Sequence, residues 1–264
     1  MADTKPQGTS SASPWPVETI SYGTHREQFG ELRVPPADSR PAPVAVLLHG
    51  GFWRSRWKLD LMEPMADDLA RRGMASWNVE YRRADRHGWD ATTADVEAAV
   101  RHLAQVAGRH PVDLSRLVLI GHSAGGQLAA RVAADSLAAA VRPAALVSLA
   151  GILDLAEAQL RSLGDGAVAA ALGGSPAERA EAYSASSPLR RLPLGIPQVI
   201  VTARGDSPDI NDLSRRYAAA AQAAGDELTV IHGDGDHFTL IDPRSRVWAD
   251  TYRQTLAALG NGCR

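Results

Sequence analysis

Short, largely apolar runs alternate with longer amphipathic segments along most of this chain, and that alternation predicts its fold class. Each short run spans five to seven positions and is bounded by Gly, Pro or polar residues. Runs of this kind are typical of strands in a parallel sheet that is covered on both faces. The runs that predict strands are 44–48, 75–79, 116–120, 144–150, 198–203 and 227–232.

The segments between these runs carry apolar residues every three or four positions, which is the spacing of an amphipathic helix. The segment 92–107 has four such residues on one face, and Gly108 follows it as a stop signal. A later helix is expected to begin at Asn211, a favourable N-cap, and to end before Gly225. The predicted helices are 62–73, 92–107, 124–136, 211–224 and 245–259.

Two regions depart from the alternation. Residues 17–22 and 27–34 predict an antiparallel pair of strands at the start of the sheet. Residues 151–195 contain no predicted strand, although connections in such folds usually span about 2–6 residues. We therefore expect a disordered tail over 1–16 and a single α/β domain over 17–264. Its mostly parallel sheet should have helices on both faces and a cap insertion at about 151–195.

Composition narrows the class of protein. The chain has 264 residues with 28 basic and 30 acidic side chains, a formal net charge of −2, so no nucleic-acid partner or membrane surface is expected. No apolar stretch is long enough for a membrane span, and the first residues lack the apolar core of a secretory signal. We expect a cytoplasmic protein that acts on a small molecule. Whether it forms a homodimer stays open at this point.

The chemistry is expected at the carboxyl ends of the strands, where open α/β sheets bind their ligands. Four of the predicted strands are followed by loops rich in glycine and polar residues. These loops are HGGFW at 49–53, GHSAGG at 121–126, RGD at 204–206 and GDGDHF at 233–238.

Ser123 is the predicted nucleophile. It stands at the centre of Gly-x-Ser-x-Gly between a strand and a helix, which is the sequence pattern of a strained turn that exposes a serine. A serine hydroxyl needs a base to take its proton, and the base needs a carboxylate to fix its tautomer. His237 is the predicted base, in preference to His232 inside a strand.

Asp206 is the predicted acid, because it follows the strand 198–203 closely and precedes His237 in the chain order of this fold. Asp209 and Asp212 compete with it, although an acid in a first helical turn is favoured by the helix dipole alone. Asp234 and Asp236 fit a turn better. The segment Arg-Gly-Asp-Ser also matches an adhesion tetrapeptide, but a catalytic acid explains Asp206 better.

An oxyanion hole is predicted from backbone N–H groups of two loops. One N–H comes from Ala124, the residue after the nucleophile, and the others come from Gly51 and Phe52. We expect no metal and no cofactor, because the chain has one cysteine and its eight histidines are dispersed.

These motifs together resemble the α/β-hydrolase superfamily over residues 17–260. Within it, HGGFW, GHSAGGQLA, DSPD at 206–209 and DHF at 236–238 are most similar to the serine-dependent kynurenine formamidases (arylformamidases) and related small esterases. The cap sequence GILDL at 151–155 is also similar, although Leu153 stands where that family often has an aromatic residue.

The resemblance implies an α/β-hydrolase fold and removal of a formyl group from N-formyl-L-kynurenine, a step of tryptophan catabolism. Aromatic contacts to the substrate are then expected from Trp53, Trp57 and Phe238. The alternatives are a general small-acyl carboxylesterase, a non-catalytic binding protein and an acyl-transferring enzyme. An amino-acid substrate would need a cation for its carboxylate, and the candidates are Arg54, Arg56, Arg82 and Arg83.

Overall fold

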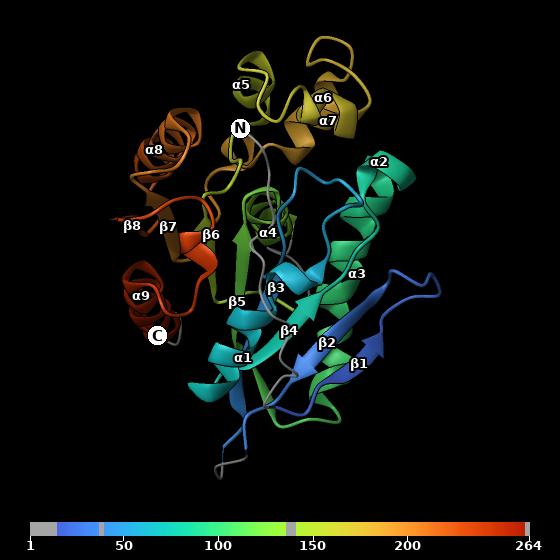
Figure 1. Cartoon of the computed structure of the whole chain (residues 1–264), viewed down its shortest axis with the longest axis vertical. Coiled ribbons are helices and arrows are strands. Elements are labelled where there is room, and N and C mark those ends of the chain that lie inside the picture. Colours follow the sequence, from blue (N-terminus) through green and yellow to red (C-terminus); the bar gives the residue numbers. More distant parts are fainter. Residues whose placement is uncertain (1–14, 37–39, 136–140, 262–264) are drawn as a thin grey trace.

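A computed structural model of the chain shows one sheet of eight strands in the order β1-β2-β4-β3-β5-β6-β7-β8 (Figure 1). The structure describes residues 15–36, 40–135 and 141–261, so residues 1–14 of the predicted tail lie outside it. The strands are β1 (Glu18–Ser21), β2 (Phe29–Arg33), β3 (Ala42–Leu48), β4 (Ala75–Val79), β5 (Val112–His122), β6 (Ala145–Leu149), β7 (Gln198–Ala203) and β8 (Leu228–Gly233).

The six strands from β3 to β8 are parallel, whereas β1 and β2 form the predicted antiparallel pair at one edge. The register brings the ends of the parallel strands to one level. Leu48 lies opposite both Val79 and Gly121, and Ala203 lies opposite Gly233. The loops after these strands therefore meet at one edge of the sheet, as the sequence predicted.

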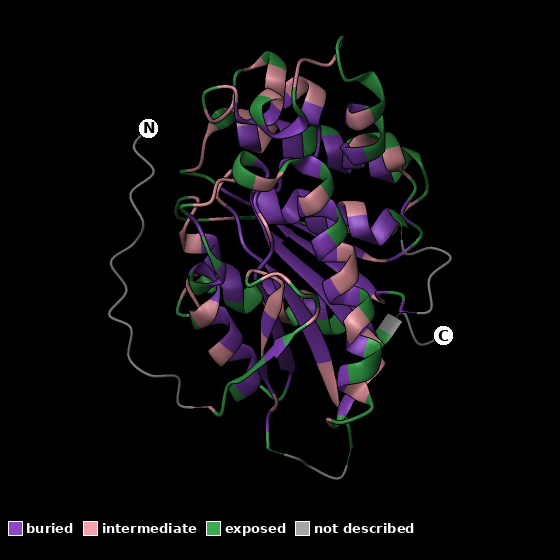
Figure 2. Cartoon of the chain, turned by 90° about the vertical axis from the view of Figure 1, so that its right-hand side faces the viewer, coloured by how far each residue is buried: buried purple, intermediate pink, exposed green. Residues whose placement is uncertain are grey.

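Helices cover both faces of the sheet, which confirms the predicted fold class. One apolar core joins the sheet to α3, α4 and α8, and a second joins it to α1 and α9. The central strands are buried between these layers, and the outer faces of the helices are exposed (Figure 2). The helices are α1 (Glu63–Arg71), α2 (Ala84–His87), α3 (Trp89–Ala107), α4 (Ala124–Asp135), α8 (Pro208–Ala223) and α9 (Arg246–Asn261).

Three short helices lie between β6 and β7, within the segment predicted as a cap insertion. They are grouped beyond one end of the sheet, away from β1 and β2 (Figure 1). Their inner residues, among them Leu155, Val168 and Leu172, are buried in the same core as α3 and α4. The cap helices are α5 (Leu155–Leu160), α6 (Ala167–Leu172) and α7 (Ala180–Ser186).

One helix boundary differs from the sequence prediction. Helix α8 begins at Pro208, with Ser207 as its N-cap residue, and not at Asn211. Proline fits the first turn of a helix because it has no N–H to satisfy there. The side chain of Asn211 instead donates a hydrogen bond of 2.9 Å to the carbonyl of Ala203. No helix in the described part of the chain is long and apolar enough to cross a membrane.

Candidate active site

The turn between β5 and α4 holds Ser123 in a strained conformation. Its φ of 55° is in the left-handed region, which L-residues other than glycine seldom adopt. The turn is tight because helix and strand touch through glycines. A Cβ on Gly125 would lie 2.0 Å from the carbonyl oxygen of Leu48, and one on Gly121 would lie 2.2 Å from that of Gly125. This is the strand-turn-helix geometry that the Gly-x-Ser-x-Gly pattern predicts.

His237 and Asp206 are in direct contact. The distance between His237 Nδ1 and Asp206 Oδ2 is 2.7 Å, and Asp206 Oδ1 accepts a hydrogen bond of 2.6 Å from the backbone N–H of Ser207. The Asp206 side chain is only 4% exposed, against 23% for His237. A carboxylate at Nδ1 places the proton there and leaves Nε2 available as a base.

The structure gives the competing residues other partners. His232 of the edge strand β8 contacts the hydroxyl of Thr202 in β7 at 2.8 Å. Asp209 and Asp212 both pair with Arg161 of the cap, at 3.0 Å and 2.7 Å. Of the remaining acids, Asp234 pairs with Arg204 of the RGDS segment, and Asp236 accepts hydrogen bonds from Phe238 and Thr239 within its own turn.

Ser123 and His237 line the same small pocket, which also contains Gly51 and Phe52 of the loop after β3. This cavity has a volume of about 20 Å³. Its other walls are Trp57, Leu61, His122 and Phe238. The structure thus brings the predicted nucleophile and base together with residues 49–53, which form the oxyanion loop.

The loop after β3 is bent sharply around this pocket. Gly51, Phe52 and Trp53 have φ angles of 111°, 52° and 55°, and only glycine takes such values without strain. In the described part of the chain, the N–H groups of Gly51 and Phe52 donate to no backbone carbonyl. Ala124 is fully buried at the N-terminus of α4. All three N–H groups predicted for the oxyanion hole therefore belong to residues beside Ser123 or in the pocket wall.

The three predicted aromatic contacts differ in position. Trp57 and Phe238 stack with ring centroids 6.2 Å apart, and both line the pocket. Trp53 does not line it: its side chain is buried, its Nε1–H donates to Gln127 at 3.2 Å, and its ring packs edge-on against Trp89. Local sequence could not separate these cases, because both tryptophans occur in one loop and differ only in long-range packing.

A buried polar network packs against His49, the first residue of the oxyanion loop. His49 stacks on Tyr81 at 4.4 Å, and the Tyr81 hydroxyl donates to the His49 carbonyl at 2.8 Å. Glu80, the residue directly after β4, accepts from the N–H of Leu59 and lies 3.3 Å from His49 Nε2. Burial lowers the pKa of His49 to about 3, so its imidazole is neutral. Glu80 was missed at the sequence level, although it follows a strand end like the other site residues.

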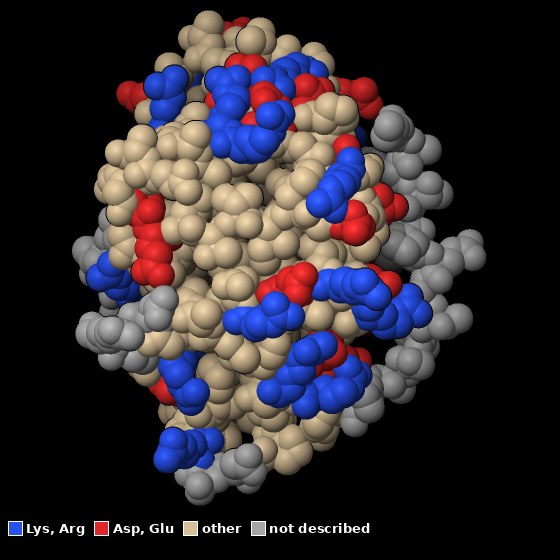
Figure 3. All heavy atoms as spheres, turned by 90° about the vertical axis from the view of Figure 1, so that its left-hand side faces the viewer, with Lys and Arg blue, Asp and Glu red and all other residues tan. Residues whose placement is uncertain are grey.

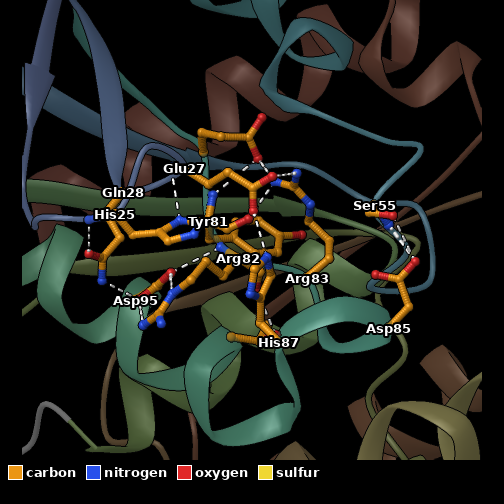
Figure 4. Close-up of polar contacts among 12 residues, drawn as sticks. His25, Glu27, Gln28, Ser55, Tyr81, Arg82, Arg83, Asp85, His87 and Asp95 are labelled. Carbon is orange, nitrogen blue, oxygen red and sulfur yellow. Dashed lines mark hydrogen bonds and ion pairs between the residues drawn. The ribbon is translucent and has the colours of Figure 1, made fainter.

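Two of the four arginines considered for a substrate carboxylate belong to this network and its surroundings (Figure 4). Arg83 is 1% exposed and pairs with Glu80 and with Glu27. Arg82 makes a two-pronged contact with Asp95 at 2.7 and 2.9 Å. Neither guanidinium is available to a ligand, because each already neutralises a buried carboxylate.

The cap touches the site through the loop after α5. Phe52 packs against Gly164, and Arg54 donates to the Gly164 carbonyl at 2.5 Å. Arg161 in the same loop pairs with Glu157 and with both acids of the first turns of α8. The cap is thereby fixed to the oxyanion loop on one side and to the helix after Asp206 on the other. On the face that includes α8, acidic and basic side chains form mixed groups around a broad area of other residues (Figure 3).

Among the described residues 15–36, 40–135 and 141–261, no three His, Cys, Asp or Glu side chains are grouped so that they could hold a metal ion. The groups at this site are those needed for acyl transfer: a hydroxyl, an imidazole, a carboxylate and backbone N–H groups of a strained loop.

Comparisons with known proteins agree with this chemistry. The BD-FAE family model matches residues 31–207. Kynurenine formamidase from Danio rerio is 26% identical over 84% of this chain and 75% of its own length. Carboxylesterase NlhH from Mycobacterium tuberculosis is 37% identical, over 38% of this chain and 31% of its own. These relatives support a hydrolase of the esterase kind.

Solved structures confirm the α/β-hydrolase fold. Esterase B from Lactobacillus rhamnosis superposes with a TM-score of 0.81 at 18% identity, over 94% of this chain and 85% of its own. Bacterial heroin esterase superposes with a TM-score of 0.78 at 21% identity, over 97% of this chain and 87% of its own.

Proposed function

Since the chain belongs to the BD-FAE family, we propose that it is a serine hydrolase that removes a formyl group from an arylamide such as N-formyl-L-kynurenine. Ser123 is the nucleophile, His237 the base and Asp206 the acid that orients it. The observation that carries this proposal is the 2.7 Å contact between His237 and Asp206, beside a pocket that His237 shares with Ser123.

The reaction follows from the positions of these groups. Ser123 Oγ attacks the formyl carbon while His237 Nε2 takes the hydroxyl proton, and the N–H groups of Gly51, Phe52 and Ala124 stabilise the oxyanion. His237 then gives this proton to the departing arylamine nitrogen as the C–N bond breaks. Water, deprotonated by His237, attacks the formyl ester and releases formate and free Ser123.

The size of the pocket favours a small acyl group. A cavity of about 20 Å³ holds little more than one water-sized group. Formyl is the smallest acyl group, with one oxygen and no carbon beyond the carbonyl. The stacked rings of Trp57 and Phe238 supply an aromatic wall for the aryl part of the substrate. The indole N–H of Trp57, which has no acceptor among the described residues, is a donor for a substrate carbonyl.

Arg54 is the best placed cation for a substrate carboxylate. Its guanidinium lies 5.8 Å from the centroid of the Phe52 ring, which lines the pocket, and its Nη2 donates to the Gly164 carbonyl and not to a carboxylate. Arg56 lies over the ring of Trp57 at 5.6 Å but is already engaged elsewhere. A carboxylate on the substrate would therefore meet Arg54 at the rim while the formyl group lies at Ser123.

A general small-acyl carboxylesterase is the second candidate function. The observation in its favour is the 37% identity to carboxylesterase NlhH, which covers 38% of this chain. The two candidates use the same nucleophile, base and oxyanion hole, so only the substrate separates them.

The deciding experiment compares kcat/KM for N-formyl-L-kynurenine and p-nitrophenyl acetate, with the Ser123→Ala variant as the blank. A formamidase prefers the formamide by orders of magnitude even though the nitrophenyl ester is chemically more reactive. Cleavage of the ester alone would contradict the formamidase assignment and favour the carboxylesterase.

A further inference from the structure

His122 is the chain neighbour of the nucleophile and contacts the base, and it has no role in the reaction described above. It is the last residue of β5, directly before Ser123, and its side chain is buried. Its Nε2 lies 3.1 Å from the backbone carbonyl oxygen of His237, and the two imidazole rings are 4.5 Å apart. The side chain thus connects the nucleophile turn to the loop that carries the base.

The contact fixes the tautomer of His122. A carbonyl oxygen only accepts hydrogen bonds, so Nε2 must carry the proton, and Nδ1 must then be a bare acceptor. Nδ1 is buried and has no donor among the described residues. Burial is the main cause that lowers the pKa of His122 well below its usual value, and the neighbouring His237 lowers it further. His122 is therefore neutral while His237 is protonated and deprotonated in turn.

The oxyanion loop also packs against His122. A Cβ on Gly50 would lie 2.9 Å from both His122 Nδ1 and Ser123 Cβ, so His122 fills the space between that loop and the base. The loop 233–238 that carries the base is also tied to the loop after β7, where Arg204 pairs with Asp234. Gly205 donates to the Gly235 carbonyl at 2.8 Å, and Asp206 holds the imidazole itself.

We propose that His122 is a positioning residue, whose Nε2–H holds the backbone of His237 so that the base stays in place over Ser123. This inference rests on the proposed function, because it assigns His122 to the same reaction. The contact with Asp206 sets the rotation of the His237 ring. The hydrogen bond from His122 sets the position of the His237 backbone from which the side chain extends. Small displacements of a catalytic group reduce the rate of the chemical step more than the binding of the substrate.

The test uses two variants that separate the hydrogen bond from the packing. His122→Phe keeps a ring and loses the donor, whereas His122→Gln keeps an N–H donor at about the same reach. We expect His122→Phe to lower kcat by about 100-fold with KM and melting temperature little changed. His122→Gln should recover at least about tenfold of that loss. His102→Phe, on α3 and remote from Ser123, is the matched control and should keep full activity.

Equal activity of His122→Phe and the wild type would overturn the proposal, and so would a loss that His122→Gln does not repair. A second readout does not depend on turnover. Nitrogen-15 NMR of the imidazoles should show His122 as the neutral Nε2–H tautomer from pH 5 to 8, and an Nδ1–H tautomer would contradict the contact. If the wild type hydrolyses neither substrate, the proposed function fails while this spectrum still reports on His122.

Discussion

Asp206 and His237 lie 31 positions apart in the chain and are joined by a 2.7 Å contact between Oδ2 and Nδ1. The contact forms because β7 and β8 are parallel neighbours whose carboxyl ends are level, with Ala203 opposite Gly233. The loop after each strand then delivers one partner. The carboxylate is buried and the imidazole is partly exposed, which is the arrangement of an acid that orients a base.

Asp206→Asn is expected to lower kcat by about three to four orders of magnitude, because an amide no longer selects the tautomer with a free Nε2. The matched variant is Asp209→Asn, three residues along the chain. Asp209 pairs with Arg161 on a half-exposed surface, so its loss should change kcat less than about threefold. Steady-state kinetics on the preferred substrate decide the matter, and the reverse ranking would move the acid to Asp209.

Gly125→Ala is expected to destabilise the fold by about 3 kcal/mol or more, because its Cβ would lie 2.0 Å from a backbone oxygen of β3. Gly108→Ala is the control. Its Cβ would come no closer than 3.4 Å to any neighbour, and the change in unfolding free energy should stay below about 1 kcal/mol. Urea denaturation measures both. Equal stability of the two variants would show that helix α4 does not pack on β3 as described.

Arg54→Met is expected to raise KM for N-formyl-L-kynurenine by about 10- to 100-fold, which is the effect of losing one charge-assisted hydrogen bond. KM for p-nitrophenyl acetate, which has no carboxylate, should change little. Arg109→Met, an exposed arginine beyond the end of α3, controls for the lost charge. Equal effects of Arg54→Met on both substrates would remove Arg54 from carboxylate recognition.

Stability should fall as the pH drops below about 6.5. His49 and His122 are held neutral by burial, His49 with a pKa of about 3, whereas both bind protons near pH 6.5 once the chain unfolds. The unfolded state therefore binds more protons in this window, and each histidine costs about 1 kcal/mol per pH unit of acidification. Urea denaturation at pH 7 and pH 5 measures the loss. His122→Gln should show a smaller pH dependence than the wild type, and an unchanged one would contradict a buried neutral His122.

The strands, the sheet class and the loops of the site could be predicted because their signals are local. Short apolar runs indicate strands, and glycines such as Gly125 indicate a tight turn between strand and helix. The positions of Trp53, Arg82 and Arg83 could not be predicted. Each is set by partners that are distant in the chain: Gln127 for Trp53, and buried carboxylates for the two arginines. The role inferred for His122 also depends on a residue 115 positions away. The start of α8 was misplaced because two adequate caps, Ser207 and Asn211, lie close together.

Covalent labelling of Ser123 tests the central claim most directly. The protein is treated with a fluorophosphonate probe, digested and mapped by mass spectrometry, with the Ser123→Ala and His237→Ala variants in parallel. The account predicts a single label on Ser123 in the wild type, much slower labelling in His237→Ala and none in Ser123→Ala. A wild-type protein that takes no label, or takes it on another serine, would contradict an activated Ser123 and return the chain to the class of non-catalytic binding proteins.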